Sequence, residues 1–255
     1  MALPLPSGLV PAEVAFLCEM EMITIVPRQR LESIPMLSGT TPPLRPPRRA
    51  DLPLWLALLL KKQRRANIVP PPWLLSPSLQ EIVHLETNVD PQAFSPPPPA
   101  PMRSDGRGVA RPYGSNTTSN DPKNPILAPP FLPSCTQDAP SGYLPYHWLE
   151  IAETLLAHAA DDVPSAAEVR GLLRDLQEVR AAKLRSSTRH LDGGGGVLSL
   201  RGVGAMELAE SRGFVLGVVD GVRRLGASVE AGRREEEEME GRGAGGGESD
   251  DDMEL

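Results

Sequence analysis

The chain has 255 residues, a formal net charge of −7, 29 prolines and only 4 % aromatic residues. This length has room for one ordinary domain or two small ones. The longest apolar run, residues 52–60, is about half of what a helix needs to cross a bilayer, so we expect no membrane-spanning segment. The first residues do not resemble a secretory signal, and two cysteines are too few for a disulfide framework. We therefore expect a reducing compartment, the cytosol or the nucleus.

The negative charge is concentrated near the C-terminus. Residues 230–255 contain 11 acidic and 3 basic residues, a net charge of −8 that leaves +1 for the rest of the chain. This glycine-rich acidic composition buries too little apolar surface to fold. We predict that residues 229–255 form a disordered acidic tail.

A second segment also has the composition of a disordered region. Residues 90–145 contain 14 of the 29 prolines and show neither a helical nor a strand period. An unstructured segment of this length is uncommon inside a compact domain. We therefore predict a disordered Pro-rich insertion over residues 94–142, either a real insertion or the product of a retained intron.

The first ordered block, residues 10–69, is predicted to be a small β-rich domain. Its pattern indicates a short helix from Pro11 and a β-branched, alternating strand that stops at Pro27. The further elements that we predict are a strand over 31–37, a helix over 54–65 and a short strand over 67–69.

Residues 70–93 and 143–228 are predicted to form an α-helical domain, which makes the fold α+β and mostly helical. The predicted helices cover residues 77–86, 146–160, 165–190 and 214–225. In the third of these, an apolar stripe runs from Val169 to Val179. We place five basic residues on its other face: Arg170, Arg174, Arg180, Lys183 and Arg185.

The sequence contains no pattern typical of catalysis. It has no phosphate-binding P-loop and no nucleophile elbow, and its four histidines lack the spacing of metal ligands. We expect no catalytic residues, no cofactor and no metal. Cys18 fits a small core position on a helix, whereas Cys135 is predicted to be a free thiol in the disordered insertion.

A basic cluster ends the predicted 54–65 helix and consists of Lys61, Lys62, Arg64 and Arg65. Basic residues at this place complement the helix dipole. Four charges exceed what a helix end needs, so a contact with a protein or a nucleic acid is the alternative. Aromatic residues are not interleaved with the cluster, which gives no support for base stacking.

The helical block has more apolar surface than about 85 residues can easily bury alone, which indicates a subunit of an assembly. For both Trp55 and Trp73 we favour packing in the core of the first domain, and a subunit interface is the alternative. The candidate subunit-interface residues are Trp55, Trp148, Leu155, Leu156, Val169, Leu172, Leu173, Leu176, Arg180 and Lys183.

Several strings resemble one known family. Near the start these are residues 12–17 and 23–27, followed by 52–57 (Leu-Pro-Leu-Trp-Leu-Ala), 60–65 (Leu-Lys-Lys-Gln-Arg-Arg) and 68–74 (Ile-Val-Pro-Pro-Pro-Trp-Leu). Downstream they are 144–153, 158–164 and 179–185. Together and in this order they resemble the second Psf subunit of the GINS complex in its fungal form.

This resemblance implies a β-rich domain followed by a helical domain, and a heterotetramer with three related subunits. It also implies that the tetramer joins the Mcm ring and the Cdc forty-five protein in the nucleus to form the replicative helicase. ATP hydrolysis would belong to the Mcm ring, so this chain would be a non-catalytic scaffold. From the residues alone, a basic nucleic-acid-binding adaptor that uses Lys61, Lys62, Arg64 and Arg65 is the alternative.

Overall fold

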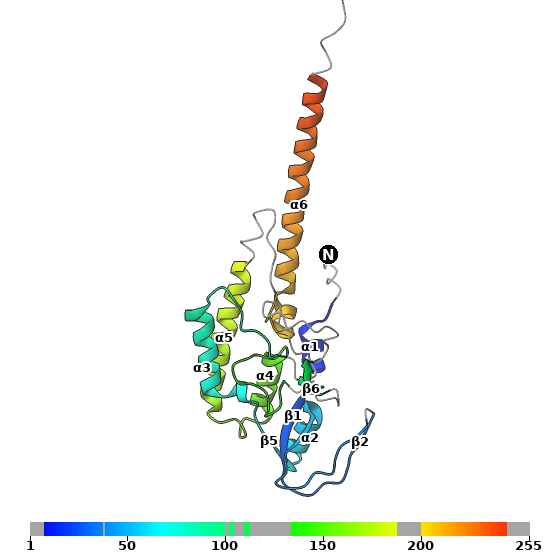
Figure 1. Cartoon of the computed structure of the whole chain (residues 1–255), viewed down its shortest axis with the longest axis vertical. Helices are drawn as coiled ribbons and strands as arrows, with labels where there is room; N and C mark the ends of the chain where they lie inside the picture. Colours follow the sequence, from blue (N-terminus) through cyan, green and yellow to red (C-terminus); the bar gives the residue numbers. More distant parts are fainter. Residues whose placement is uncertain are drawn as a thin grey trace, which may run out of the picture. The chain divides into compact units, whose positions relative to one another are not determined.

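The computed structural model describes residues 8–37, 39–99, 102–104, 110–112, 134–187 and 200–243. Figure 1 shows its helices and strands, coloured along the sequence. Its contacts divide the chain into two units. The first contains the described residues up to 186 together with 200–211, and the second contains Ser187 and the described residues from 212 onward.

A three-stranded antiparallel sheet forms the centre of the N-terminal region. The strands are β1 (Met22–Pro27), β4 (Ala50–Pro53) and β5 (Ala66–Ile68), in the order β4-β1-β5. Ile23 lies opposite Leu52, and Ile25 lies opposite both Ala50 and Ile68. The predicted first strand is confirmed, and the predicted strand over 67–69 begins one residue earlier.

Two short helices accompany this sheet, α1 (Pro11–Cys18) and α2 (Leu54–Lys62). The predicted strand over 31–37 is wrong in extent, because only a single bridge from Leu31 to Leu44 and the two-residue β2 (Pro35–Met36) form there. Strand β2 pairs with β3 (Gly39–Thr40). Proline has no backbone donor, and the many prolines of this segment therefore keep its pairing short.

Helices form the rest of the first unit. They are the 3₁₀ turn η1 (Pro72–Leu74), α3 (Ser76–His84), the π-helical turn η2 (Leu85–Val89), α4 (Trp148–His158) and α5 (Ala166–Ser187). A small hairpin joins β6 (Met102–Ser104) to β7 (Ala110–Pro112). Helix α6 (Ala205–Gly243) begins in the first unit and continues through the second. The predicted fold class, α+β and mostly helical, is confirmed.

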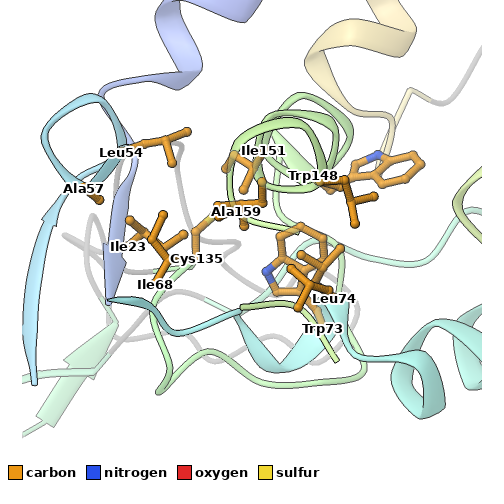
Figure 2. Close-up of a cluster of buried hydrophobic side chains, with 14 of the residues drawn as sticks. Ile23, Leu54, Ala57, Ile68, Trp73, Leu74, Cys135, Trp148, Ile151 and Ala159 are labelled. Atoms are coloured by element: carbon orange, nitrogen blue, oxygen red, sulfur yellow. The ribbon is translucent and has the colours of Figure 1, made fainter. Parts of the chain in front are cut away.

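One hydrophobic core joins the sheet to the helices (Figure 2). Ile23 and Ile68 come from the sheet, Trp73 from η1, and Trp148 from α4. All four side chains are at least 96 % buried. The core position predicted for Trp73 is therefore confirmed.

Part of the predicted disordered insertion is packed instead. Cys135 is completely buried in the core, so its predicted place in a disordered segment is wrong (Figure 2). The N–H of Gln137 donates to Thr24 Oγ1 on β1 at 3.0 Å. Apolar side chains and satisfied backbone groups thus anchor residues 134–142 to the sheet. Residues 100–101, 105–109 and 113–133 lie outside the described residues.

The predicted disordered tail also needs correction. Helix α6 extends from Ala205 to Gly243, so residues 229–243 are helical. Glu, Arg and Ala are good helix formers, and this local preference is a reason for the helix to continue beyond 228. The rest of the predicted tail, residues 244–255, lies outside the described residues.

Candidate interaction surfaces and a buried ion cluster

A buried arginine joins three parts of the first unit. Arg180 on α5 is 1 % exposed. Its Nη1 donates to Glu86 Oε1 in η2 at 2.6 Å, and its Nε and Nη2 donate to the carboxylate of Glu207 on α6 at 2.7 and 2.9 Å. The guanidinium also lies over the rings of Phe94 and Trp148, at 4.9 and 5.6 Å from their centroids.

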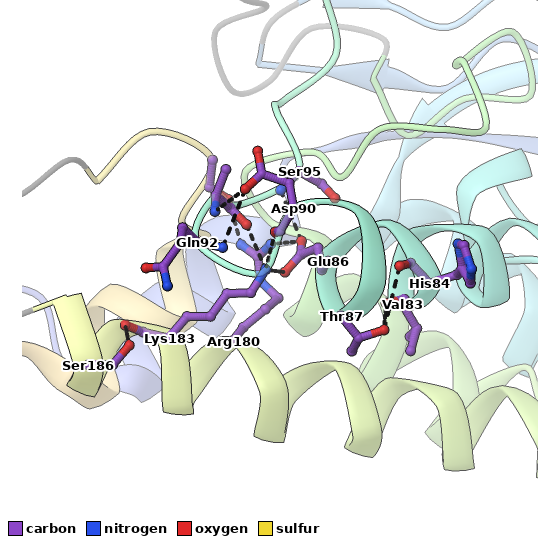
Figure 3. A network of polar contacts seen from close by, with 12 residues as sticks. Val83, His84, Glu86, Thr87, Asp90, Gln92, Ser95, Arg180, Lys183 and Ser186 are labelled. Atoms are coloured by element: carbon purple, nitrogen blue, oxygen red, sulfur yellow. Dashed lines mark hydrogen bonds and ion pairs between the residues drawn. The ribbon is translucent and has the colours of Figure 1, made fainter.

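Lys183 lies one turn further along α5 and completes this cluster (Figure 3). Its Nζ donates to Glu86 Oε2 at 3.2 Å and to the carbonyls of Asp90 and Ala93 at 3.3 and 2.6 Å. The N–H of Ser95 donates to Glu86 Oε1 at 2.9 Å. Two cations and two carboxylates thus balance each other, which is the arrangement that buried charges require.

The surroundings keep Glu86 ionised. Burial by itself would raise the pKa of this carboxyl, but the charge of Arg180, the hydrogen bond from Ser95 and the charge of Lys183 together lower the pKa below its ordinary value. Burial likewise opposes the charge of Arg180, but Glu207 and Glu86 raise its pKa. A carboxylate held charged between two cations is poorly suited to exchange protons near neutral pH, so the cluster is structural.

The prediction that Arg180 and Lys183 lie on the polar face of their helix is wrong, because both are buried. They follow Leu176 at i+4 and i+7, which is the spacing of the apolar stripe. This spacing was the signal that sequence reasoning missed. Their carboxylate partners are remote in sequence, and no local pattern could have identified them.

Eight of the ten predicted interface side chains are buried within the chain: Trp148, Leu155, Leu156, Val169, Leu173, Leu176, Arg180 and Lys183. They stabilise this chain. Trp55 is 37 % exposed and Leu172 is partly buried. Contact of these ten residues with partner subunits stays a prediction.

The predicted basic contact divides into two parts. Lys61 Nζ lies 2.7 Å from Asp161 Oδ2 and 2.7 Å from Asp162 Oδ2, just beyond α4. Asp162 Oδ2 also accepts the N–H of Ile68 on β5 at 2.7 Å. Lys61 therefore joins the sheet region to the helices. Its charge is paired with these two aspartates within the chain. The other members of the predicted contact, Lys62, Arg64 and Arg65, are exposed.

In the second unit, α6 presents apolar side chains to solvent. Phe214, Leu225 and Val229 are 43 %, 68 % and 73 % exposed, and they lie at i, i+11 and i+15. This spacing places them within about 60° of each other around the helix. Val218 and Val222 lie between them on the same face and are partly exposed. We call these five residues the α6 stripe.

The described residues contain no group of three or more His, Cys, Asp and Glu side chains that could hold a metal ion. Within the same part of the chain, no helix has the length and apolar character of a membrane span.

Both cysteines are buried, and burial raises the pKa of the Cys18 thiol to about 12. A thiol with such a pKa is a poor nucleophile at neutral pH.

Two family models match this chain. The model described as GINS complex protein helical bundle domain matches residues 115–226, and the model described as PSF2 N-terminal domain matches residues 10–69. The first match identifies the helical region as a GINS helical bundle. The second match identifies the preceding sheet region as the N-terminal domain of the PSF2 family.

Curated relatives agree with both matches. "DNA replication complex GINS protein PSF2" of Gibberella zeae is 69 % identical over 232 residues, which cover 90 % of each chain. The protein of the same name in Neurospora crassa is 62 % identical over an alignment that covers all of both chains. The one in Schizosaccharomyces pombe is 32 % identical over 88 % of this chain and 96 % of its own length. The chain therefore belongs to the PSF2 family of GINS complex subunits, which act in DNA replication.

Proposed function

We propose that this chain is a non-catalytic scaffold subunit of a heterotetrameric GINS complex. Its partners are the three other GINS subunits, and the assembled tetramer joins the Mcm ring and the Cdc forty-five protein to form the replicative helicase in the nucleus. The family membership supports this assignment. In the proposal, residues 10–69 are the β-rich domain, and residues 70–93 and 143–228 are the helical domain.

The α6 stripe is the observation that carries the proposal. Its five apolar side chains share one helix face and are exposed or partly exposed in the second unit, whose described residues are Ser187 and the remainder of α6. Exposure of an apolar helix face to water is unfavourable, and a protein that covers this face stabilises the helix. We therefore assign to the stripe a contact with another GINS subunit.

The test is co-expression of the full chain with the three other GINS subunits, followed by size-exclusion chromatography with light scattering. The wild-type chain is expected in a single peak with the mass of a one-to-one-to-one-to-one tetramer. Replacement of Phe214 and Leu225 by Asp should abolish or strongly reduce that peak, because two carboxylates would have to be buried in the contact.

A matched control uses the opposite face of the same helix. Ala227 is exposed and lies about 200° around the helix from Leu225, so Ala227→Asp should leave the tetramer peak unchanged. A wild-type chain that elutes alone would contradict the scaffold proposal. A tetramer that tolerates the double Asp replacement would contradict the role of the stripe.

A further inference from the structure

One end of the N-terminal sheet collects exposed basic side chains. Between residues 22 and 69 the sequence has nine basic and two acidic residues. Lys61 pairs with Asp161 and Asp162, and the other eight basic side chains are exposed. We call these eight residues the basic end: Arg28, Arg30, Arg45, Arg48, Arg49, Lys62, Arg64 and Arg65.

The strand register brings these residues together. Arg28 follows the end of β1, and Pro27 at this end lies opposite Ala66, the first residue of β5. Arg64 and Arg65 immediately precede Ala66, and the N–H of Arg28 donates to the Arg65 carbonyl at 2.7 Å. On the other side of β1, Ile25 lies opposite Ala50, which follows Arg48 and Arg49.

The remaining members lie at the same end. The bridge between Leu31 and Leu44 makes Arg30 and Arg45 neighbours across an antiparallel pair, two residues beyond Arg28. Lys62 is the last residue of α2, just before Arg64. Residues that are up to 37 positions apart in sequence therefore share one end of a sheet that is about 10 Å wide across its three strands.

Two carboxylates lie close to the basic end. Glu32 follows Leu31, and Asp51 follows Ala50 and accepts a hydrogen bond from Thr24 Oγ1 at 2.6 Å. Two further glutamates lie at a greater distance. The N–H groups of Leu54 and Trp55, at the start of α2, donate to the carbonyls of Glu21 and Glu19, so these glutamates lie near the beginning of that helix. The basic end begins at its other terminus, nine residues and roughly 13 Å away. No carboxylate of the described residues forms an ion pair with a member of the basic end.

Arg64 adopts a backbone conformation that is unfavourable for arginine. Its φ is 58°, in the left-handed region that glycine occupies most easily. Its N–H donates to the Lys61 carbonyl at 2.8 Å, and that of Arg65 donates to the Leu60 carbonyl at 2.9 Å. This is a Schellman turn, in which glycine is the usual residue at the position of Arg64. Residues with a strained backbone cluster at binding sites, so this conformation is consistent with a ligand that contacts the Arg64 side chain.

We propose that the basic end binds the phosphate backbone of duplex DNA. Seven of its eight cations are arginines, whose planar donors suit phosphate oxygens. Trp55 is the only aromatic residue between 22 and 69 and lies at the far end of α2, so the surface offers phosphate contacts without base stacking. This role goes beyond scaffolding and does not depend on tetramer assembly.

The test measures binding of the full chain to a fluorescein-labelled 30-base-pair duplex by fluorescence anisotropy over a range of salt concentrations. The variant replaces Arg48, Arg49, Arg64 and Arg65 with Ala. Each lost phosphate contact removes a slope of about 0.9 from the dependence of log affinity on log salt. The slope should become shallower by roughly 3 to 4, and binding at low salt should weaken at least about tenfold.

A control variant removes the same charge elsewhere, by replacing the exposed residues Arg174, Arg201, Arg223 and Arg224 with Ala. Its affinity should stay within about twofold of the wild type, since these residues are outside the proposed contact. Equal losses in the two variants would overturn the proposal, because they would show an effect of net charge alone. A preference of about tenfold for a single strand would also overturn it.

Arg64→Gly separates binding from folding. Glycine adopts a φ of 58° without strain, so the melting temperature should stay the same or increase. The salt slope should nevertheless become shallower by about 1 because one phosphate contact is lost. Unchanged binding by both this variant and the four-Ala variant, with loss of an acidic protein partner instead, would assign the surface to that protein and refute DNA binding.

Discussion

At the scale of single residues, Arg180 is a buried cation that pairs with two carboxylates. It is the only side chain that contacts both Glu86 and Glu207 among the described ion pairs, and it joins η2 to the first turn of α6. If it is removed, two carboxylates lose their main counter-charge in a buried site. Removing one partner from a buried ion pair costs far more than the pair itself contributes.

We predict that Arg180→Met lowers the free energy of unfolding by about 3 to 5 kcal/mol. Methionine retains much of the packing volume but leaves Glu86 and Glu207 without the guanidinium. Urea denaturation followed by circular dichroism measures the change. Arg174→Met is the matched control, because Arg174 lies on the same helix and is exposed. Similar values for the two variants would contradict a stabilising role for the cluster.

Sequence patterns predicted apolar burial better than charged burial. The helical period groups Val169, Leu173 and Leu176 on one apolar face, and these three residues are buried within the chain, although we predict them at a subunit interface. Arg180 follows the same period, but its charge led to a prediction of exposure. The burial of a charge depends on whether counter-charges meet it in space, and Glu86 lies 94 residues away. Local periodicity contains no information about ion pairs between residues that are far apart in sequence.

At the scale of elements, two glycines have opposite roles. Gly202, just before α6, has a φ of 84°, and a Cβ there would lie 2.5 Å from the carbonyl oxygen of Ser95. Its carbonyl also accepts a hydrogen bond from Arg180. Gly171 lies inside α5, and nothing lies within 4 Å of where its Cβ would be. The first glycine is required by its backbone, whereas the second only weakens its helix.

We predict that Gly202→Ala destabilises the chain by about 1 to 3 kcal/mol, because alanine is strained at positive φ and would collide with Ser95. Gly171→Ala should stabilise it by about 0.5 to 1 kcal/mol, the difference in helix propensity. Both values can be measured by urea denaturation under identical conditions. Changes of the same sign would show that the close approach at Gly202 is unimportant.

Elements with a strong period were predictable and irregular ones were not. Strand β1 and helices α4 and α5 lie close to their predicted ranges, because each has a clear apolar pattern. Residues 134–142 have no such pattern, yet Cys135 and Ala139 are buried. They owe their order to tertiary packing against the core, which composition alone does not reveal.

At the scale of the whole first unit, a small polar contact joins the sheet region to the helices. Lys61 at the end of α2 pairs with Asp161 and Asp162, which follow α4. The side chain of Asp162 is 11 % exposed and that of Asp161 is 68 % exposed. Only Asp162 also accepts the N–H of Ile68, on an outer strand of the sheet. The two adjacent aspartates therefore offer a comparison within one contact.

We predict that Asp162→Ala lowers the free energy of unfolding by about 1 to 3 kcal/mol, because the N–H of the buried Ile68 would lose its acceptor. Asp161→Ala should cause a much smaller loss, since water screens an exposed ion pair. The measurement is urea denaturation followed by both tryptophan fluorescence and circular dichroism.

The two probes also test whether this contact couples the sheet to the helices. Coincident transitions in the wild type would show that both regions unfold as one cooperative unit. If the contacts of Asp162 with Lys61 and Ile68 maintain that cooperativity, Asp162→Ala should separate the two transitions. Asp161→Ala should leave them coincident. Equal effects of the two substitutions would mean that the ion pair with Lys61, and not the hydrogen bond to Ile68, holds the regions together.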